Sequence, residues 1–170
     1  MELKEVLQYR RSVRKFLPRT VNDALLEEIL RTAQRAPSAG NLQAYRVKIV
    51  RGDEEKNALR EATMRRQESL TSAPVVLVIC AKGAESAEKY GERGATLYAV
   101  QDATLYAAYV QLALTDRGLS SVWVGAFSEE DVRTALSLPP ALRPIIMLPL
   151  GYAAEAPSER ERKDIQDIIV

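Results

Sequence analysis

The feature that most constrains this sequence is a long segment, residues 95–115, with helical character and almost no charge. Asp102 is its only charged residue, so little of the helix surface suits contact with water. Polar residues still interrupt the segment at short intervals, which argues against a membrane span. The segment therefore predicts a central helix, buried within the fold or in an interface between two chains.

Shorter segments on either side predict a mixture of strands and helices. Residues 75–80 form a continuous apolar run, as in a strand that is covered on both faces. Further strands are expected at residues 45–50, 122–124 and 143–152. Further helices are expected at residues 3–8, from Asn22 until Pro37 stops the helix, at 53–67, and at 129–136 after Ser128 as N-cap. This order predicts an α+β fold, one sheet flanked by helices, in a single domain of residues 1–170.

The composition removes several kinds of chemistry. The chain has no histidine, which excludes histidine triads, imidazole acid–base catalysis and most zinc sites. Its one cysteine, Cys80, belongs to the apolar strand and is expected in the core, so no disulfide and no metal site are expected. Chemistry near neutral pH is therefore expected to come from a bound cofactor.

Charge is almost balanced over the whole chain but not locally. The net charge of +1 gives no reason to expect a nucleic acid or a membrane as partner. Charged and apolar residues alternate over residues 1–8, so no secretory signal is expected and the cytoplasm is the expected compartment. Residues 9–19, by contrast, contain five basic residues and no acidic one.

Arg10, Arg11, Ser12 and Arg14 form a candidate phosphate site. A guanidinium group donates two hydrogen bonds to phosphate oxygens, and the serine hydroxyl adds a neutral donor. A basic run taken alone is more often a solvated surface. The loop at residues 36–43, Ala-Pro-Ser-Ala-Gly-Asn-Leu-Gln, suits contact with a planar polar ring, although it could be only a helix stop and a turn. Together the two segments indicate a nucleotide-like cofactor.

These segments, with Trp-x-Gly at residues 123–125 and Leu-Gly-Tyr at 150–152 followed by arginines, resemble the FMN-dependent nitroreductase family. The motifs occur in the family's order from about Leu3 to about Lys163. The resemblance implies a central, mainly antiparallel sheet, an intertwined homodimer and FMN at the subunit interface. No Gly-x-Gly-x-x-Gly follows a strand, so NADH or NADPH is expected as a visiting reducing substrate.

The resemblance also assigns cofactor contacts. Pro37, Ser38 and Asn41 match positions that reach the flavin ring of the partner subunit, and Gln67 matches a position that bonds the flavin pyrimidine. Family members place backbone N–H groups against flavin N5 where this chain has Gly125 and Ala126, and basic residues against the phosphate where it has Arg160 and Arg162. Trp123 itself is expected to pack in the core. Ala44 departs from the proline often found there.

The function that the resemblance implies is ping-pong reduction of nitroaromatics, quinones or similar electron-poor acceptors by NAD(P)H, with hydride transfer through flavin N5. No side chain is expected to act as the catalytic acid. Three alternatives remain: reductive dehalogenation, flavin fragmentation, and flavin binding without efficient turnover. The chain is shorter than many relatives, so a more open flavin pocket is expected.

Overall fold

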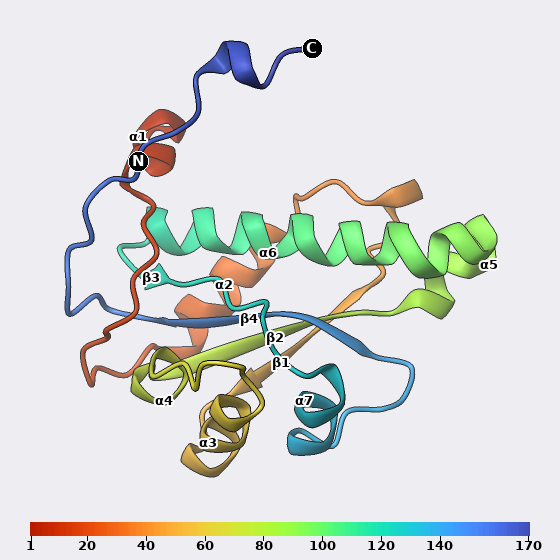
Figure 1. Cartoon of the computed structure of the whole chain (residues 1–170), viewed down its shortest axis with the longest axis horizontal. Helices are drawn as coiled ribbons and strands as arrows, with labels where there is room; N and C mark the ends of the chain where they lie inside the picture. Colours follow the sequence, from red (N-terminus) through yellow and green to blue (C-terminus); the bar gives the residue numbers. More distant parts are fainter.

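A four-stranded sheet forms the centre of the molecule (Figure 1), in a computed structural model that describes all residues from 1 to 170. The strands lie in the order β1-β2-β4-β3, and all three pairings are antiparallel. The strands are β1 (Tyr45–Val50), β2 (Val75–Ala81), β3 (Ser120–Ser121) and β4 (Arg143–Gly151). The expected α+β class is confirmed.

Strand β2 is the core of this sheet because both of its faces are covered. Its odd-numbered residues, including Leu77 and Ile79, pack in one hydrophobic cluster, whereas Val76, Val78 and Cys80 pack in a second cluster. All seven residues of β2 are buried. A continuous apolar run is what a strand between two apolar layers requires.

Helices form the two layers. The first cluster contains residues of α2 (Asp23–Ala33) and α6 (Ala99–Asp116), and the second contains residues of α3 (Asp53–Glu61) and α7 (Glu129–Ala135). Figure 1 shows α6 on one side of the sheet and α3 and α7 on the other. The remaining helices are α1 (Leu3–Tyr9), α4 (Ser69–Ser72) and α5 (Gly83–Arg93).

The long apolar segment is α6, preceded by a π-helical turn at Gly94–Tyr98. One side of α6 is buried against the sheet and α2, as expected. Its other side exposes Leu105 and Tyr109, which are 39% and 38% exposed. No helix in the structure has the length and apolar character needed to cross a membrane.

Three expectations for the secondary structure need correction. Helix α3 ends at Glu61 because the next residues turn toward residues 126–128, where Ala62 O accepts from Ser128 N at 2.9 Å. The strand expected at 122–124 is β3 at Ser120–Ser121, followed by an isolated bridge between Val124 and Met147. Helix α2 ends at Ala33, one turn before Pro37. Helix α5 was not expected.

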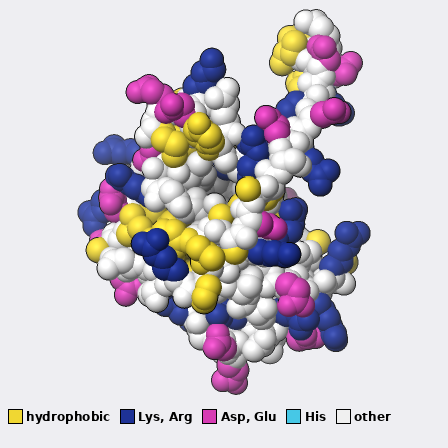
Figure 2. All heavy atoms as spheres, turned by 90° about the vertical axis from the view of Figure 1, so that its left-hand side faces the viewer, with side chains coloured by type: hydrophobic (Ala, Val, Ile, Leu, Met, Phe, Trp, Pro, Cys, Tyr) yellow, Lys and Arg dark blue, Asp and Glu magenta, His cyan; other side chains and the backbone are white.

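The two ends of the chain meet at one end of the sheet. The N-terminal segment after α1 lies beside the C-terminal segment after β4, and the last residues project away from the body (Figure 1). Backbone hydrogen bonds join the two segments, from Leu17 N to Tyr152 O at 2.8 Å and from Ala154 N to Lys15 O at 2.9 Å. Figure 2 looks onto this end and shows Lys and Arg side chains around the base of the projecting segment.

Candidate cofactor site

A cavity of about 420 Å³ opens where the two ends of the chain meet, and none of its lining residues is hydrophobic except proline. The cavity brings together all six basic-site residues expected from the sequence. They are Arg10, Arg11, Ser12, Arg14, Arg160 and Arg162, to which Pro157 and Ser158 are added. Segments 150 residues apart in the sequence therefore present five arginines to one space.

Only one of these five arginines has a carboxylate partner. Arg11 forms an ion pair of 3.3 Å with Glu159, and its guanidinium also donates to the backbone oxygens of Gln8 and Arg10. Arg14 and Arg162 donate to backbone oxygens within their own segments. Guanidinium groups that face one cavity without balancing acids repel one another, and a phosphate dianion relieves that repulsion. The donor set therefore fits a phosphate group.

The backbone fixes this geometry on the N-terminal side. Ser12 forms a parallel bridge with Ser121 at the end of β3, and Val13 N donates to Ser121 O at 3.1 Å. Val13 is buried, which leaves Ser12 and Arg14 on the opposite side of the extended segment. Because successive side chains of an extended segment point to opposite sides, Ser12 and Arg14 both point toward the cavity.

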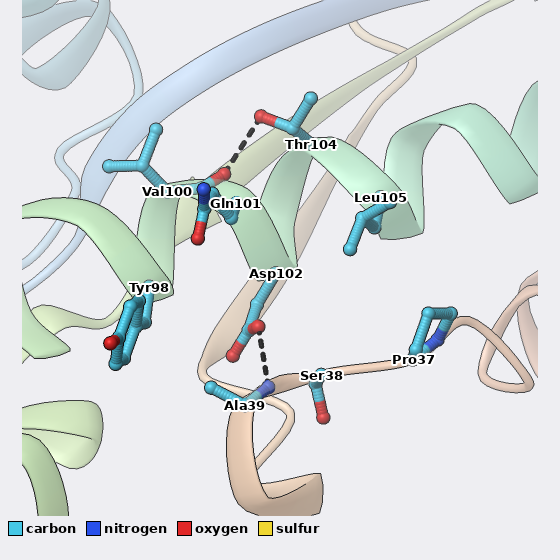
Figure 3. Close-up of a pocket in the computed structure, with 9 residues that line it drawn as sticks. All are labelled: Pro37, Ser38, Ala39, Tyr98, Val100, Gln101, Asp102, Thr104 and Leu105. Atoms are coloured by element: carbon cyan, nitrogen blue, oxygen red, sulfur yellow. Dashed lines mark hydrogen bonds between the residues drawn. The ribbon is translucent and has the colours of Figure 1, made fainter.

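A second cavity, of about 570 Å³, lies between the loop after α2 and the first turns of α6 (Figure 3). Pro37 and Ser38 line it from the loop side, as Figure 3 shows. The helix side is lined by Tyr98, Val100, Gln101, Asp102, Thr104 and Leu105. The cavity is more apolar than the basic one, so it suits a ring better than a phosphate.

The loop has an unusual backbone that its own sequence explains. Gly40, Asn41 and Gln43 have φ values of +57°, +57° and +51°, in the left-handed region that glycine and asparagine tolerate best. The Ser38 hydroxyl accepts from Gln43 N at 3.1 Å and closes the turn. Asn41 is exposed and does not line the cavity.

Asp102 connects this loop to α6. Its carboxylate is buried, and Oδ1 accepts a hydrogen bond of 2.9 Å from Ala39 N, drawn in Figure 3. Burial raises the pKa of the Asp102 carboxyl, and hydrogen bonds from the N–H groups of Ala39 and Ala44 oppose this rise. Oδ2 has no hydrogen-bond partner. The pKa of Tyr45 is raised by burial and also by the charge of Asp102.

The remaining predicted contacts form a third group. Gln67 N donates to Thr63 Oγ1 at 3.0 Å, and Met64 N donates to Ala126 O at 3.4 Å. These bonds place the loop of Gln67 beside Gly125 and Ala126. Within one chain, neither the basic cavity nor the cavity beside α6 is lined by a residue of this group. Trp123 was expected in the core, but it lies at the surface and is 37% exposed.

Several residues at these cavities were not assigned a role from the sequence. Asp102 gave one signal, since it is the only charge in an apolar helix. Tyr98 and Ser158 gave none, because nothing local distinguishes them. The structure also shows no cluster of three or more histidine, cysteine, aspartate or glutamate side chains that could hold a metal ion.

A basic cavity where the chain ends meet, a more apolar cavity beside the loop after α2, and a sheet covered by helices on both faces characterise this α+β protein. The model of the Nitroreductase family matches residues 7–66 and 61–152. The chain belongs to the nitroreductase family, and it is an oxidoreductase.

Relatives and solved structures agree with this assignment. The chain is 31% identical over 197 residues to an NADH dehydrogenase of Thermus thermophilus, covering 100% of this chain and 96% of that one. It is 28% identical over 179 residues to an iodotyrosine dehalogenase 1 homolog of Caenorhabditis elegans, covering 89% of this chain and 54% of that one. A protein of Exiguobacterium sibiricum, described as a nitroreductase in complex with FMN, matches with a TM-score of 0.87 at 18% identity, covering 100% and 97% of the two chains.

Proposed function

We propose that this chain is an FMN-dependent oxidoreductase that uses NADH or NADPH to reduce nitroaromatics, quinones or similar electron-poor acceptors. In the reaction NAD(P)H gives up a hydride, and a quinone takes up the equivalent of that hydride with one proton from water. FMN, when bound, supplies the atom that accepts and releases the hydride. Residues 1–170 act as one FMN-binding domain, and the cytoplasm is the proposed compartment.

The observation that carries this proposal is the cavity with five arginines and no hydrophobic side chain except proline. Arg10, Arg14, Arg160 and Arg162 hold the phosphate through charge-assisted hydrogen bonds, and Ser12 adds a neutral donor. An FMN complex of a structure with the same fold supports the choice of cofactor. A phosphate-free flavin would leave these arginines without a counter-charge.

The other residues are proposed to orient the ring and exclude water. Pro37, Ser38 and Asn41 contact the ring from the partner subunit, and Gln67 bonds a pyrimidine edge because its amide both donates and accepts. Backbone N–H groups near Gly125 and Ala126 face the reacting edge, where small residues permit close approach. No side chain is assigned as the catalytic acid.

A homodimer is part of the same proposal. The exposed side of α6 carries Leu105 and Tyr109, and α1 beside it exposes Leu3 and Leu7 at 66% and 56%. Exposed apolar side chains on two helices in contact are candidates for an interaction site. A second copy would cover it and bring the loop of Ser38 to the partner's basic cavity. Sedimentation of the FMN-loaded protein should show a dimer, and a stable FMN-loaded monomer would contradict the arrangement.

The experiment that tests the cofactor assignment compares FMN with riboflavin, which lacks the phosphate. Each arginine–phosphate contact is worth on the order of 1.5–3 kcal/mol, so Arg10→Ala and Arg160→Ala should each weaken FMN binding roughly tenfold to a hundredfold. Riboflavin affinity should change little. Arg35→Ala, an exposed arginine outside the cavity, is the matched control. If either variant binds FMN as tightly as the parent protein, the arginine that it replaces does not contact the phosphate.

Kinetics test the proposed reaction. NAD(P)H and the electron acceptor should occupy the same site one after the other, because the chain has no second nucleotide-binding motif. Initial-rate plots at several acceptor concentrations should then be parallel, and intersecting lines would indicate two separate sites.

Reductive dehalogenation is a second candidate, supported by the iodotyrosine dehalogenase 1 homolog among the relatives. In that reaction NAD(P)H again supplies the hydride equivalent, which forms a carbon–hydrogen bond at the carbon where the carbon–halogen bond breaks to release halide. Halide release from an iodinated phenol, measured beside nitro-group reduction with the same enzyme, distinguishes the two activities.

A further inference from the structure

The C-terminal segment that carries Arg160 and Arg162 has few attachments to the rest of the chain. Backbone pairing between the two chain ends stops with the hydrogen bond from Ala154 N to Lys15 O. Beyond that point, two side-chain contacts reach another segment. One is the exposed ion pair of Glu159 with Arg11 at 3.3 Å, and exposed pairs of this kind contribute little.

The other contact is made by Glu155. Its Oε1 accepts hydrogen bonds from two consecutive backbone N–H groups, those of Arg14 at 2.6 Å and Lys15 at 3.2 Å. Hydrogen bonds to a charged acceptor are roughly twice as strong as neutral ones. The Glu155 side chain is half-buried.

Glu155 lies beside the basic cavity but outside it. A carboxylate close to a phosphate site repels the phosphate if it faces the same space. Glu155 does not line the basic cavity; it lines a neighbouring hollow of about 310 Å³ together with Val13 and Ser120. Its charge is directed at the backbone of the N-terminal arginine segment and forms no ion pair. The contact therefore joins the two arginine-bearing segments without neutralising an arginine.

We propose that Glu155 is a positioning residue that holds the C-terminal arginines against the N-terminal ones and so sets the preference for a phosphorylated flavin. The inference rests on the proposed FMN function. Glu155 is five residues before Arg160, and Pro157 stiffens the connection between them. When Glu155 makes these two hydrogen bonds, Arg160 and Arg162 already lie beside Arg10 and Arg14. Without the Glu155 contact, the C-terminal segment must become ordered each time the phosphate of FMN binds, and the entropy lost in that ordering lowers the affinity for FMN.

The test is a set of variants titrated with FMN and with riboflavin in the full-length protein. Glu155→Ala should weaken FMN binding about tenfold and leave riboflavin binding within about twofold of the parent, since only the phosphate end is disturbed. Glu155→Gln keeps a neutral acceptor oxygen at the same reach, so its FMN affinity should lie between those of Glu155→Ala and the parent. Glu159→Ala removes a carboxylate of the same segment and should not weaken FMN binding.

Three results would overturn the proposal. The first is an FMN affinity of Glu155→Ala equal to that of the parent. The second is an equal loss for FMN and riboflavin, which would indicate general damage to the fold; thermal melting of each variant measures such damage independently. The third is Glu155→Gln binding FMN as weakly as Glu155→Ala. Failure of the proposed function looks different, because the parent protein itself would then show no preference for FMN over riboflavin.

Discussion

Replacing Asp102 by alanine tests whether this buried carboxylate holds the loop of residues 37–43 in place. Asp102 is 2% exposed, and its carboxylate accepts a hydrogen bond from the N–H group of Ala39. In the alanine variant this N–H group loses its acceptor, and an unsatisfied buried group costs about 1–3 kcal/mol. Relief of the carboxylate's own desolvation offsets part of this loss. We expect Asp102→Ala to lower the free energy of unfolding by roughly 1–2 kcal/mol.

Asp102→Asn separates the charge from the hydrogen bonds, because asparagine keeps an acceptor oxygen. Burial raises the pKa of the Asp102 carboxyl above its ordinary value of 3.8, so the folded protein binds this proton more tightly than the unfolded chain. The resulting stability is fully present below the ordinary pKa and is lost as pH rises through the folded-state pKa. The difference in unfolding free energy, parent minus variant, should therefore fall as pH increases from about 4.

Chemical denaturation of both proteins at one protein concentration, from about pH 4 to about pH 7, measures this difference. Asp116→Asn is the matched control with the opposite sign. The Met1 ammonium lies 2.7 Å from Asp116 and holds the pKa of that carboxyl below its ordinary value, so the corresponding difference should rise with pH. A flat or rising difference for Asp102→Asn would refute the conclusion that desolvation of the Asp102 carboxylate outweighs its stabilisation by nearby backbone N–H groups.

Three further predictions concern other parts of the fold. Gly40→Ala places a methyl group 2.5 Å from the Tyr90 hydroxyl at a φ of +57°, so it should destabilise the protein by about 1–2 kcal/mol in denaturant unfolding; an unchanged midpoint would mean that the loop relaxes freely. Burial raises the pKa of the Cys80 thiol to about 11, so an aromatic disulfide reagent should label it only after unfolding, and rapid labelling of the native protein would contradict its burial. Leu77→Ala, at a fully buried position of β2, should cost about 2–5 kcal/mol of stability, and a loss much below this would mean that the two layers close the cavity.

Elements whose pattern is local were predicted well from the sequence. The apolar run of β2 and the apolar segment of α6 each indicate burial through their own composition. Caps behaved the same way: the Asn22 side chain accepts from Ala24 N, and the Ser128 side chain accepts from Asp131 N. Such features depend on side chains within a few positions of one another, so one sequence is enough to find them.

Features that depend on distant contacts were not predictable in the same way. Helix α3 ends where the following backbone forms hydrogen bonds with residues 126–128. The local sequence around Glu61 does not indicate this contact. Trp123 has the size and strand context of a core residue but lies at the surface. The partner of Asp102 could not be found either, because Ala39 contributes only its backbone N–H, which every residue except proline has.

The basic cavity shows how a nearly neutral chain can still gather positive charge at one place. A net charge of +1 gives no long-range attraction, yet five arginines from the two chain ends share one cavity. Exposed acids elsewhere on the chain balance the total charge, and only one of them, Glu159, pairs with an arginine of the cavity. Attraction is therefore confined to the place where residues 10–14 and 157–162 meet. No backbone–backbone hydrogen bond joins the residues after Ala154 to the rest of the chain. The proposed selectivity for a phosphorylated flavin therefore depends on what holds the second of these segments, and Glu155 makes two of its hydrogen bonds to the first segment.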